Sequence, residues 1–152
     1  MTRGQFILLA AGGSALILLG AIGFQYLGGV TPCAMCLWQR WAHGAVVLIG
    51  LVALALPRGP VVATGMLAAL TGAGIALYHS GVERGWWLGP TSCTSAPLDG
   101  MSPQAAFEQM MAAPLVRCDE IPWQILGLSL ANLNIGLSLG LAVFWALALR
   151  AR

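Results

Sequence analysis

Cys33 and Cys36 are separated by two residues, follow Pro32 and precede an apolar segment. A C-x-x-C pair is typical of dithiol redox chemistry or of half a metal site. If a helix begins near Cys33, both thiols lie in its first turn, where unpaired amides and the helix dipole stabilise a thiolate. We therefore expect a redox-active pair; the alternative is a fixed structural disulfide.

The chain has two further cysteines, Cys93 and Cys118. Four cysteines fit two disulfides, and they also fit four metal thiolates. Structural zinc sites favour two close cysteine pairs, whereas Cys93 and Cys118 are 25 positions apart with no histidine or further cysteine at short spacing. We expect no metal.

The composition indicates which environment surrounds these cysteines. Of the 152 residues, 59% are hydrophobic and only 8% are charged, against about 25% charged residues in soluble domains. So few charges cannot cover a soluble surface, and a lipid bilayer is the expected surroundings. The net charge of +2 is too small and too scattered to indicate nucleic acid.

Four segments approach the roughly 20 apolar residues that a membrane-spanning helix needs. We predict one all-α transmembrane domain over residues 1–152, a bundle of four spans at about 6–27, 37–56, 61–78 and 125–149. A short first outer loop (28–36) and a long second one (80–122) would connect them, and Ser102-Pro103 would start a helix on the membrane surface. Gly65 and Ala69, and likewise Gly136 and Gly140, have the spacing of small residues at helix contacts.

The charged residues predict an orientation. Four spans place both termini on one side, with Arg3, Arg58, Arg150 and Arg152, and leave Arg40, Arg84 and Arg117 on the other. By this bias of four arginines against three, the positive-inside rule predicts that the first side is cytoplasmic. All four cysteines would then face the compartment where disulfides persist. The opposite side would hold every acidic residue: Glu83, Asp99, Glu108, Asp119 and Glu120.

Arg40 lies one helical turn after Cys36, and His43 continues the same face beyond Gln39. Ionisable residues inside a membrane are costly and usually functional, so these donors could hold a membrane-soluble acceptor with polar carbonyls beside Cys36. Arg40 could instead extend to the headgroups, and His43 could serve as an interhelical hydrogen-bond partner.

His79 and Glu83 lie one turn apart at the outer end of the third span. Because dithiol oxidation releases two protons, this pair could assist proton transfer. An interfacial hydrogen-bonded pair is the alternative. Asn132 and Asn134 are expected to form interhelical hydrogen bonds.

This arrangement resembles the DsbB family, the bacterial disulfide bond formation proteins, over essentially the whole chain. The resemblance is carried by Cys33-Ala34-Met35-Cys36, by Arg40 four residues later, and by Cys93 and Cys118 in the second outer loop. The related vitamin K epoxide reductases differ, because their C-x-x-C follows the loop cysteines.

The resemblance implies a function. Such a protein would reoxidise a DsbA-like periplasmic partner by passing electrons to ubiquinone or menaquinone, in the bacterial inner membrane with cytoplasmic termini. Cys93 would be attacked by the partner, and Cys118 would be released to pair transiently with Cys33. Cys36 would lie beside the quinone, which Arg40 would hold; His43 and His79 are further candidates for binding it.

One position departs from the family pattern. Gln39 stands before Arg40, where family members often carry glutamate, so we expect no acid–arginine pair there. We expect a quinone-dependent oxidoreductase. The alternatives are a membrane scaffold with two static disulfides and a reductase that runs the same relay backwards.

Overall fold

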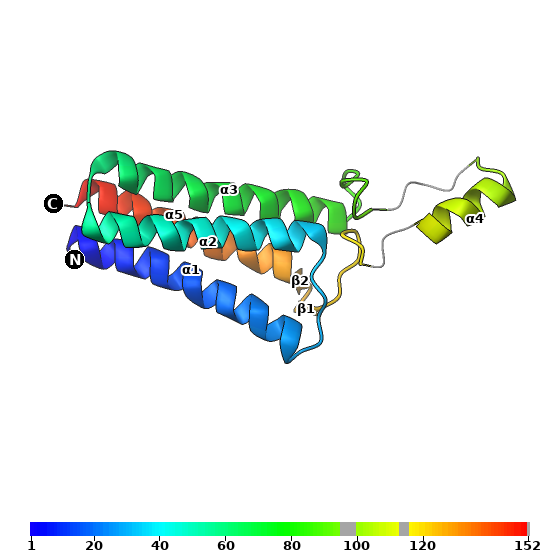
Figure 1. Ribbon diagram of the computed structural model, residues 1–152, viewed down its shortest axis with the longest axis horizontal. Coiled ribbons are helices and arrows are strands. Elements are labelled where there is room, and N and C mark those ends of the chain that lie inside the picture. Colours follow the sequence, from blue (N-terminus) through cyan, green and yellow to red (C-terminus); the bar gives the residue numbers. More distant parts are fainter. Residues whose placement is uncertain (95–99, 113–115, 152) are drawn as a thin grey trace.

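The computed structural model of the chain describes residues 1–94, 100–112 and 116–151, which leaves Asp99 and Arg152 outside the described residues. Four long helices lie side by side as a bundle, with both termini at the same end (Figure 1). Each is long and apolar enough to cross a membrane, which confirms the predicted all-α, four-helix membrane fold. They are α1 (Arg3–Tyr26), α2 (Ala34–Ala55), α3 (Gly59–Glu83) and α5 (Leu130–Arg150).

Two helix bounds differ from the expected spans in ways that affect the site. Helix α3 continues to Glu83 rather than ending near residue 78, so His79 and Glu83 belong to the bundle. Helix α5 begins at Leu130, five residues later than expected, because residues 124–129 form a hairpin.

That hairpin pairs β1 (Gln124–Ile125) with β2 (Leu128–Ser129) in antiparallel fashion. Its two turn residues, Leu126 and Gly127, have φ angles of 49° and 77°, and positive φ at both positions is the mark of a type I′ turn. Ser129 then caps α5, because its hydroxyl accepts from the Asn132 amide at 3.2 Å. The hairpin thus fixes where α5 starts.

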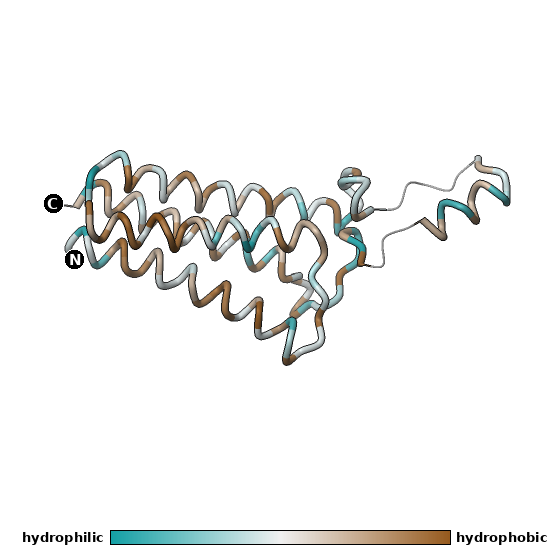
Figure 2. The backbone as a smooth tube through the Cα atoms, in the orientation of Figure 1, coloured by the Kyte–Doolittle hydropathy of each residue, from teal (hydrophilic) through white to brown (hydrophobic). Residues whose placement is uncertain are grey.

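The outside of the bundle is apolar. Large side chains such as Leu16 and Leu48 are 72% and 66% exposed, and hydrophobic residues recur along all four helices (Figure 2). Such a surface is stable against lipid tails. The protein is a multi-pass membrane protein.

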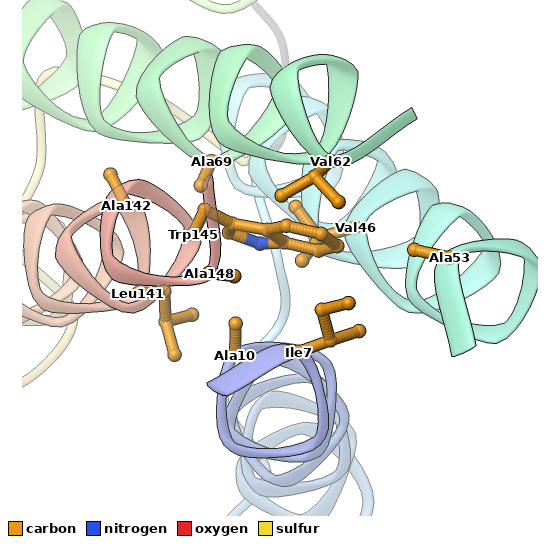
Figure 3. Close-up of a cluster of buried hydrophobic side chains, with 10 residues drawn as sticks. All are labelled: Ile7, Ala10, Val46, Ala53, Val62, Ala69, Leu141, Ala142, Trp145 and Ala148. Carbon is orange, nitrogen blue, oxygen red and sulfur yellow. The ribbon is translucent and has the colours of Figure 1, made fainter. Parts of the chain in front are cut away.

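The interior near the termini is packed around Trp145, which is fully buried (Figure 3). A Cβ on Gly65 would lie 2.5 Å from the Trp145 ring, so this glycine makes room for the indole. The predicted small-residue contact at Gly65 is therefore present. The predicted contact at Gly136 and Gly140 is wrong, because a Cβ on either would meet nothing within 4 Å.

Arg3 closes the same end of the bundle. Its Nε donates to the carbonyl of Ala148 at 3.1 Å and to that of Ala151 at 3.0 Å. Its Nη1 donates to the carbonyl of Pro57 at 2.9 Å. One side chain thus links α1 to the α2–α3 turn and to the end of α5.

The second connection carries a short helix, α4 (Pro103–Ala112). None of its residues is buried, and it stands away from the four long helices (Figure 1). The helix itself lies where Ser102-Pro103 predicted; its position on a membrane surface stays a prediction.

Candidate functional site

The C-x-x-C pair forms the start of α2. Cys33 is the N-cap residue, and its Sγ accepts a hydrogen bond from the Cys36 amide at 3.2 Å. Both cysteines are free thiols, with their Sγ atoms 2.9 Å apart. The hydrogen bond to Cys36, and after it burial, raise the pKa of the Cys33 thiol well above its usual range.

The loop cysteines form the second pair. Cys93 and Cys118 are joined by a disulfide, a pairing that residue spacing alone had left open. Both are buried against Cys33, together with Met35 and Val82. The Cys118 amide donates to the Cys93 carbonyl at 2.7 Å, which closes the loop around the disulfide.

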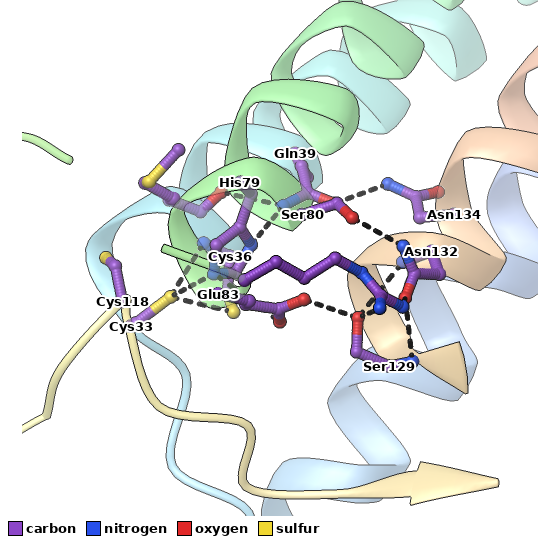
Figure 4. Close-up of polar contacts among 12 residues, drawn as sticks. Cys33, Cys36, Gln39, His79, Ser80, Glu83, Cys118, Ser129, Asn132 and Asn134 are labelled. Carbon is purple, nitrogen blue, oxygen red and sulfur yellow. Dashed lines mark hydrogen bonds and ion pairs between the residues drawn. The ribbon is translucent and has the colours of Figure 1, made fainter. Parts of the chain in front are cut away.

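The two pairs meet at Cys33. Its Sγ, the Cys118 Sγ and a ring nitrogen of His79 all lie within 4.8 Å of one another (Figure 4). Because metal binding requires a thiolate and the Cys118 sulfur is committed to a disulfide, this grouping suits thiol–disulfide exchange.

Cys36 lines a cavity of about 790 Å³ between α1, α2 and α5. Its walls are largely apolar, with side chains such as Ile17, Phe24 and Leu137. An apolar cavity of this size with a few convergent polar groups is typical of a small-molecule site. Every predicted site residue from the helices lies on its wall: Cys33, Cys36, Arg40, His43 and His79.

Arg40 is held at the cavity wall by α1. Its Nη1 donates to the Gln25 side-chain oxygen, and its Nη2 donates to the Ala21 carbonyl at 2.9 Å. These bonds direct the guanidinium toward the bundle, and they argue against the headgroup position considered from the sequence. A guanidinium has five N–H donors, so donors remain for an oxygen inside the cavity.

His79, near the end of α3, contacts the start of α2 through both ring nitrogens. One ring nitrogen, Nδ1, is 2.9 Å from Gln39 Nε2. The other, Nε2, is 3.5 Å from Cys33 Sγ and 3.8 Å from Glu83 Oε1. Glu83 in turn accepts from the Ser129 hydroxyl. The predicted His79–Glu83 pair is thus present, and its histidine contacts Cys33.

His43 is part of a separate set of contacts deeper in the bundle. Its Nδ1 lies 3.0 Å from Ser14 Oγ, and its Nε2 lies 2.8 Å from Asn134 Oδ1. Asn134 Nδ2 donates to Gln39 Oε1 at 2.7 Å. Asn134, and likewise Asn132 through Ser80, form the interhelical hydrogen bonds that were predicted.

An ion pair flanks Cys118 on the loop side. Arg117 donates from Nε and Nη2 to the two carboxylate oxygens of Asp119, at 3.0 and 2.6 Å. These hydrogen bonds lower the pKa of the Asp119 carboxyl. The pair joins the residues on either side of Cys118.

Sequence reasoning missed Ser14 and Gln25. Gln25 carried a usable signal, because an amide within a predicted span is expected to find a polar partner. Ser14 carried none, since a single serine is common in apolar helices and its role depends on which helix faces it.

Comparison with known proteins agrees with the geometry. The family model for disulfide bond formation protein DsbB matches residues 3–148. Disulfide bond formation protein B of Aromatoleum aromaticum is 32% identical over 165 residues, covering 99% of this chain and 93% of the relative. Disulfide bond formation protein B 2 of Pseudomonas aeruginosa is 34% identical over 155 residues, covering 92% and 84%.

A shorter match is more similar. Disulfide bond formation protein B of Alkalilimnicola ehrlichii is 42% identical over 82 residues, which cover 51% of this chain and 49% of that relative. No solved structure matches the chain. Since the family model covers nearly all of the chain and long matches exceed 30% identity, the chain belongs to the DsbB family of disulfide bond formation proteins.

Proposed function

We propose that this protein reoxidises a DsbA-like periplasmic thiol oxidase and passes the electrons through its two cysteine pairs to a membrane quinone. Membership of the family supports a disulfide-forming oxidoreductase. The observation that carries the relay is the meeting of the pairs, in which Cys118 Sγ and Cys33 Sγ lie within 4.8 Å. Thiol–disulfide exchange only redistributes disulfides, so net formation requires an electron acceptor.

The first exchange takes place in the outer loop. A thiolate of the partner attacks Cys93 Sγ, forms a mixed disulfide and breaks the Cys93–Cys118 bond, so Cys118 leaves as a thiolate. The partner's second thiol then attacks its own sulfur in the mixed disulfide and releases Cys93. The partner has lost two electrons and two protons, and the loop pair has gained the electrons.

The second exchange transfers those electrons into the bundle. When Cys33 and Cys36 are oxidised, the Cys118 thiolate attacks Cys33 Sγ and releases Cys36 as a thiolate. Cys93 then attacks Cys118, which restores the loop disulfide and frees Cys33. Cys33 and Cys36 are now both reduced, and they are free thiols in this structure as well.

The cavity beside Cys36 fits a quinone head group. Its apolar walls suit a ring, and Arg40, held by Gln25 and Ala21, presents donors suited to a ring carbonyl. A bound quinone, ubiquinone or menaquinone, would supply the capacity to accept two electrons and two protons. Binding roles for His43 and His79, which line the same cavity, stay predictions.

The experiment combines purified protein, a reduced DsbA-like partner and a soluble quinone analogue, and follows quinone absorbance. We expect reduction by the unaltered protein and by a Ser102→Ala control, and none by Cys36→Ser. Reduction that persists in Cys36→Ser would contradict the relay. Disulfides that stay inert to added dithiol would instead indicate the static scaffold, and partner reduction by quinol would indicate the reductase.

Trapping tests the order of the cysteines. With Cys118 replaced by alanine, Cys93 is a free thiol, so we supply the oxidised partner. The Cys93 thiolate attacks the partner's disulfide and releases one partner thiolate, and the mixed disulfide should accumulate because Cys118 is absent to displace the partner. Mass spectrometry of the covalent complex locates the linkage. A linkage found only at Cys33 would reverse the proposed order of the two pairs.

A further inference from the structure

We propose that Glu83 is a further catalytic residue, whose carboxyl holds a proton at the cavity wall and gives it to the electron acceptor bound beside Cys36. The inference rests on the proposed function, because it takes that acceptor to be a quinone. Reduction of a quinone consumes two electrons and two protons. The electrons come from the cysteine pair, and the protons need donors inside a largely apolar cavity.

Several side chains on the cavity wall could in principle exchange a proton. Besides the two cysteines they are Arg40, His43, His79, Glu83, Arg117 and Glu120. An arginine stays protonated in proteins. Both ring nitrogens of His43 are engaged, with Ser14 at 3.0 Å and Asn134 at 2.8 Å. Glu120 is 67% exposed and lies 3.4 Å from Arg117, so water and a cation hold it ionised.

His79 and Glu83 remain, and of these two Glu83 has the free atom. His79 Nδ1 lies 2.9 Å from Gln39 Nε2, and its Nε2 lies 3.5 Å from Cys33 Sγ. Glu83 extends from α3 toward the start of α5, where its Oε2 accepts from the Ser129 hydroxyl (Figure 4). Within the described part of the chain its Oε1 accepts no hydrogen bond, and His79 Nε2 is 3.8 Å away. That oxygen is available to a molecule in the cavity.

The surroundings of this carboxyl suit it to hold a proton. Its side chain is 3% exposed, and among the described residues it forms no ion pair with an arginine. Arg84, the next residue, donates instead to the Gly127 carbonyl and the Asn132 side chain. A carboxyl that is buried without a cation favours its neutral form. Ser129, itself 1% exposed, is the positioning residue that fixes the carboxyl at the wall.

The protons then balance. Under the proposed relay Cys36 is released as a thiolate, so the reduced pair brings one proton, one fewer than the acceptor gains. Glu83 supplies the second: its O–H bond breaks, the electron pair of that bond stays on the carboxylate, and the proton joins an acceptor oxygen. Glu83 is the last residue of α3, so the carboxylate can regain a proton from water at the outer end of the bundle.

Infrared spectroscopy tests the stored proton without any acceptor. At neutral pH we expect the unaltered protein in lipid nanodiscs to show the C=O band of a protonated carboxyl. Glu83→Gln should abolish this band, because the amide has no carboxyl proton. Glu108→Gln is the matched control, since Glu108 is exposed on α4; it should leave the band unchanged.

A single turnover tests the use of the proton. We mix the dithiol-reduced protein with a soluble quinone analogue and follow its absorbance. In Glu83→Gln the rate should fall about 100-fold, the usual effect of removing a general acid. Binding of the analogue, measured by quenching of tryptophan fluorescence, should change less than about twofold, because the amide keeps the shape of the side chain. Glu108→Gln should match the unaltered protein in both measurements.

Three results would overturn the inference. One is the absence of a protonated carboxyl band in the unaltered protein, which needs no variant to fold. The second is the same band in Glu83→Gln. The third is a Glu83→Gln rate equal to that of Glu108→Gln. An unaltered protein that shows the band but reduces no analogue would contradict the relay instead, so the two failures are distinct.

Discussion

Arg40 illustrates how one side chain defines the cavity. Its spacing from Cys36 predicts that the two side chains share one face of a helix. In the structure both residues lie on α2, about one turn apart. What the sequence could not supply was the partner. Gln25 and Ala21 come from α1, and which helix faces Arg40 depends on packing.

Arg40→Met should weaken quinone binding. Methionine fills similar space but offers no N–H donor, so the apparent KM for quinone should rise about tenfold or more, the effect of losing a hydrogen bond from a charged group. The KM for the protein partner should change far less. Steady-state assays that vary each substrate in turn measure both values.

Arg58→Met provides the comparison, because it removes the same charge at the opposite end of the bundle, beside α3. It should leave both constants unchanged. A quinone KM that is equal in Arg40→Met and Arg58→Met would remove Arg40 from the proposed site.

At the scale of elements, the contact between α3 and α5 depends on Gly65 and Trp145. A Cβ at Gly65 would lie 2.5–2.6 Å from three atoms of the indole ring, which is rigid and fully buried. Trp145 is held on its other sides by Ile7, Val46 and Val62 (Figure 3). The ring therefore has no direction in which to move.

Gly65→Ala should destabilise the protein by about 1–3 kcal/mol, the usual cost of overpacking a filled core. Gly136→Ala is the matched change, because its Cβ meets nothing within 4 Å; it should be neutral or stabilise by up to about 1 kcal/mol through helix propensity. Unfolding in mixed detergent micelles measures both. Equal effects would contradict the assigned packing.

The same elements show what was predictable. Apolar length located all four long helices, because the bilayer fixes how many residues a span needs. It misplaced the start of α5, because Ile125, Leu126 and Leu128 are as apolar as the helix and only the Leu126–Gly127 turn distinguishes them. Gly136 had the right spacing but the wrong face, which spacing alone does not reveal.

The site, too, was only partly predictable from the sequence. Gln39, His43 and Asn134 were each recognisable as polar residues in apolar helices. Their connection into one series was not, because it depends on how α2 and α5 are rotated against each other.

At the scale of the whole molecule, the charges are asymmetric. Arg3, Arg58 and Arg150 lie at the end that holds the termini, while the cysteines and α4 lie toward the other (Figure 1). With Arg152 included, four arginines lie on the side of the termini, against Arg40, Arg84 and Arg117 on the other. From this bias we propose cytoplasmic termini and periplasmic cysteines in the inner membrane.

Labelling of single cysteines tests this topology. In a variant without the four native cysteines, Ser102→Cys should react with a membrane-impermeant maleimide in cells whose outer membrane is permeable. Arg58→Cys should react only after the inner membrane is opened. Because both positions are exposed, a permeant maleimide should label each equally. The reverse pattern would invert the proposed orientation.

The cap of α2 has a consequence for the backbone. Cys33 Sγ holds the first turn of this helix through the Cys36 amide, and under the proposed relay the same sulfur changes covalent partner in every cycle. Its strength as a hydrogen-bond acceptor therefore changes as well. The first turn of α2 should therefore be ordered to a different degree in the oxidised and the reduced protein. Catalysis and fraying of this helix end are then coupled through one sulfur atom.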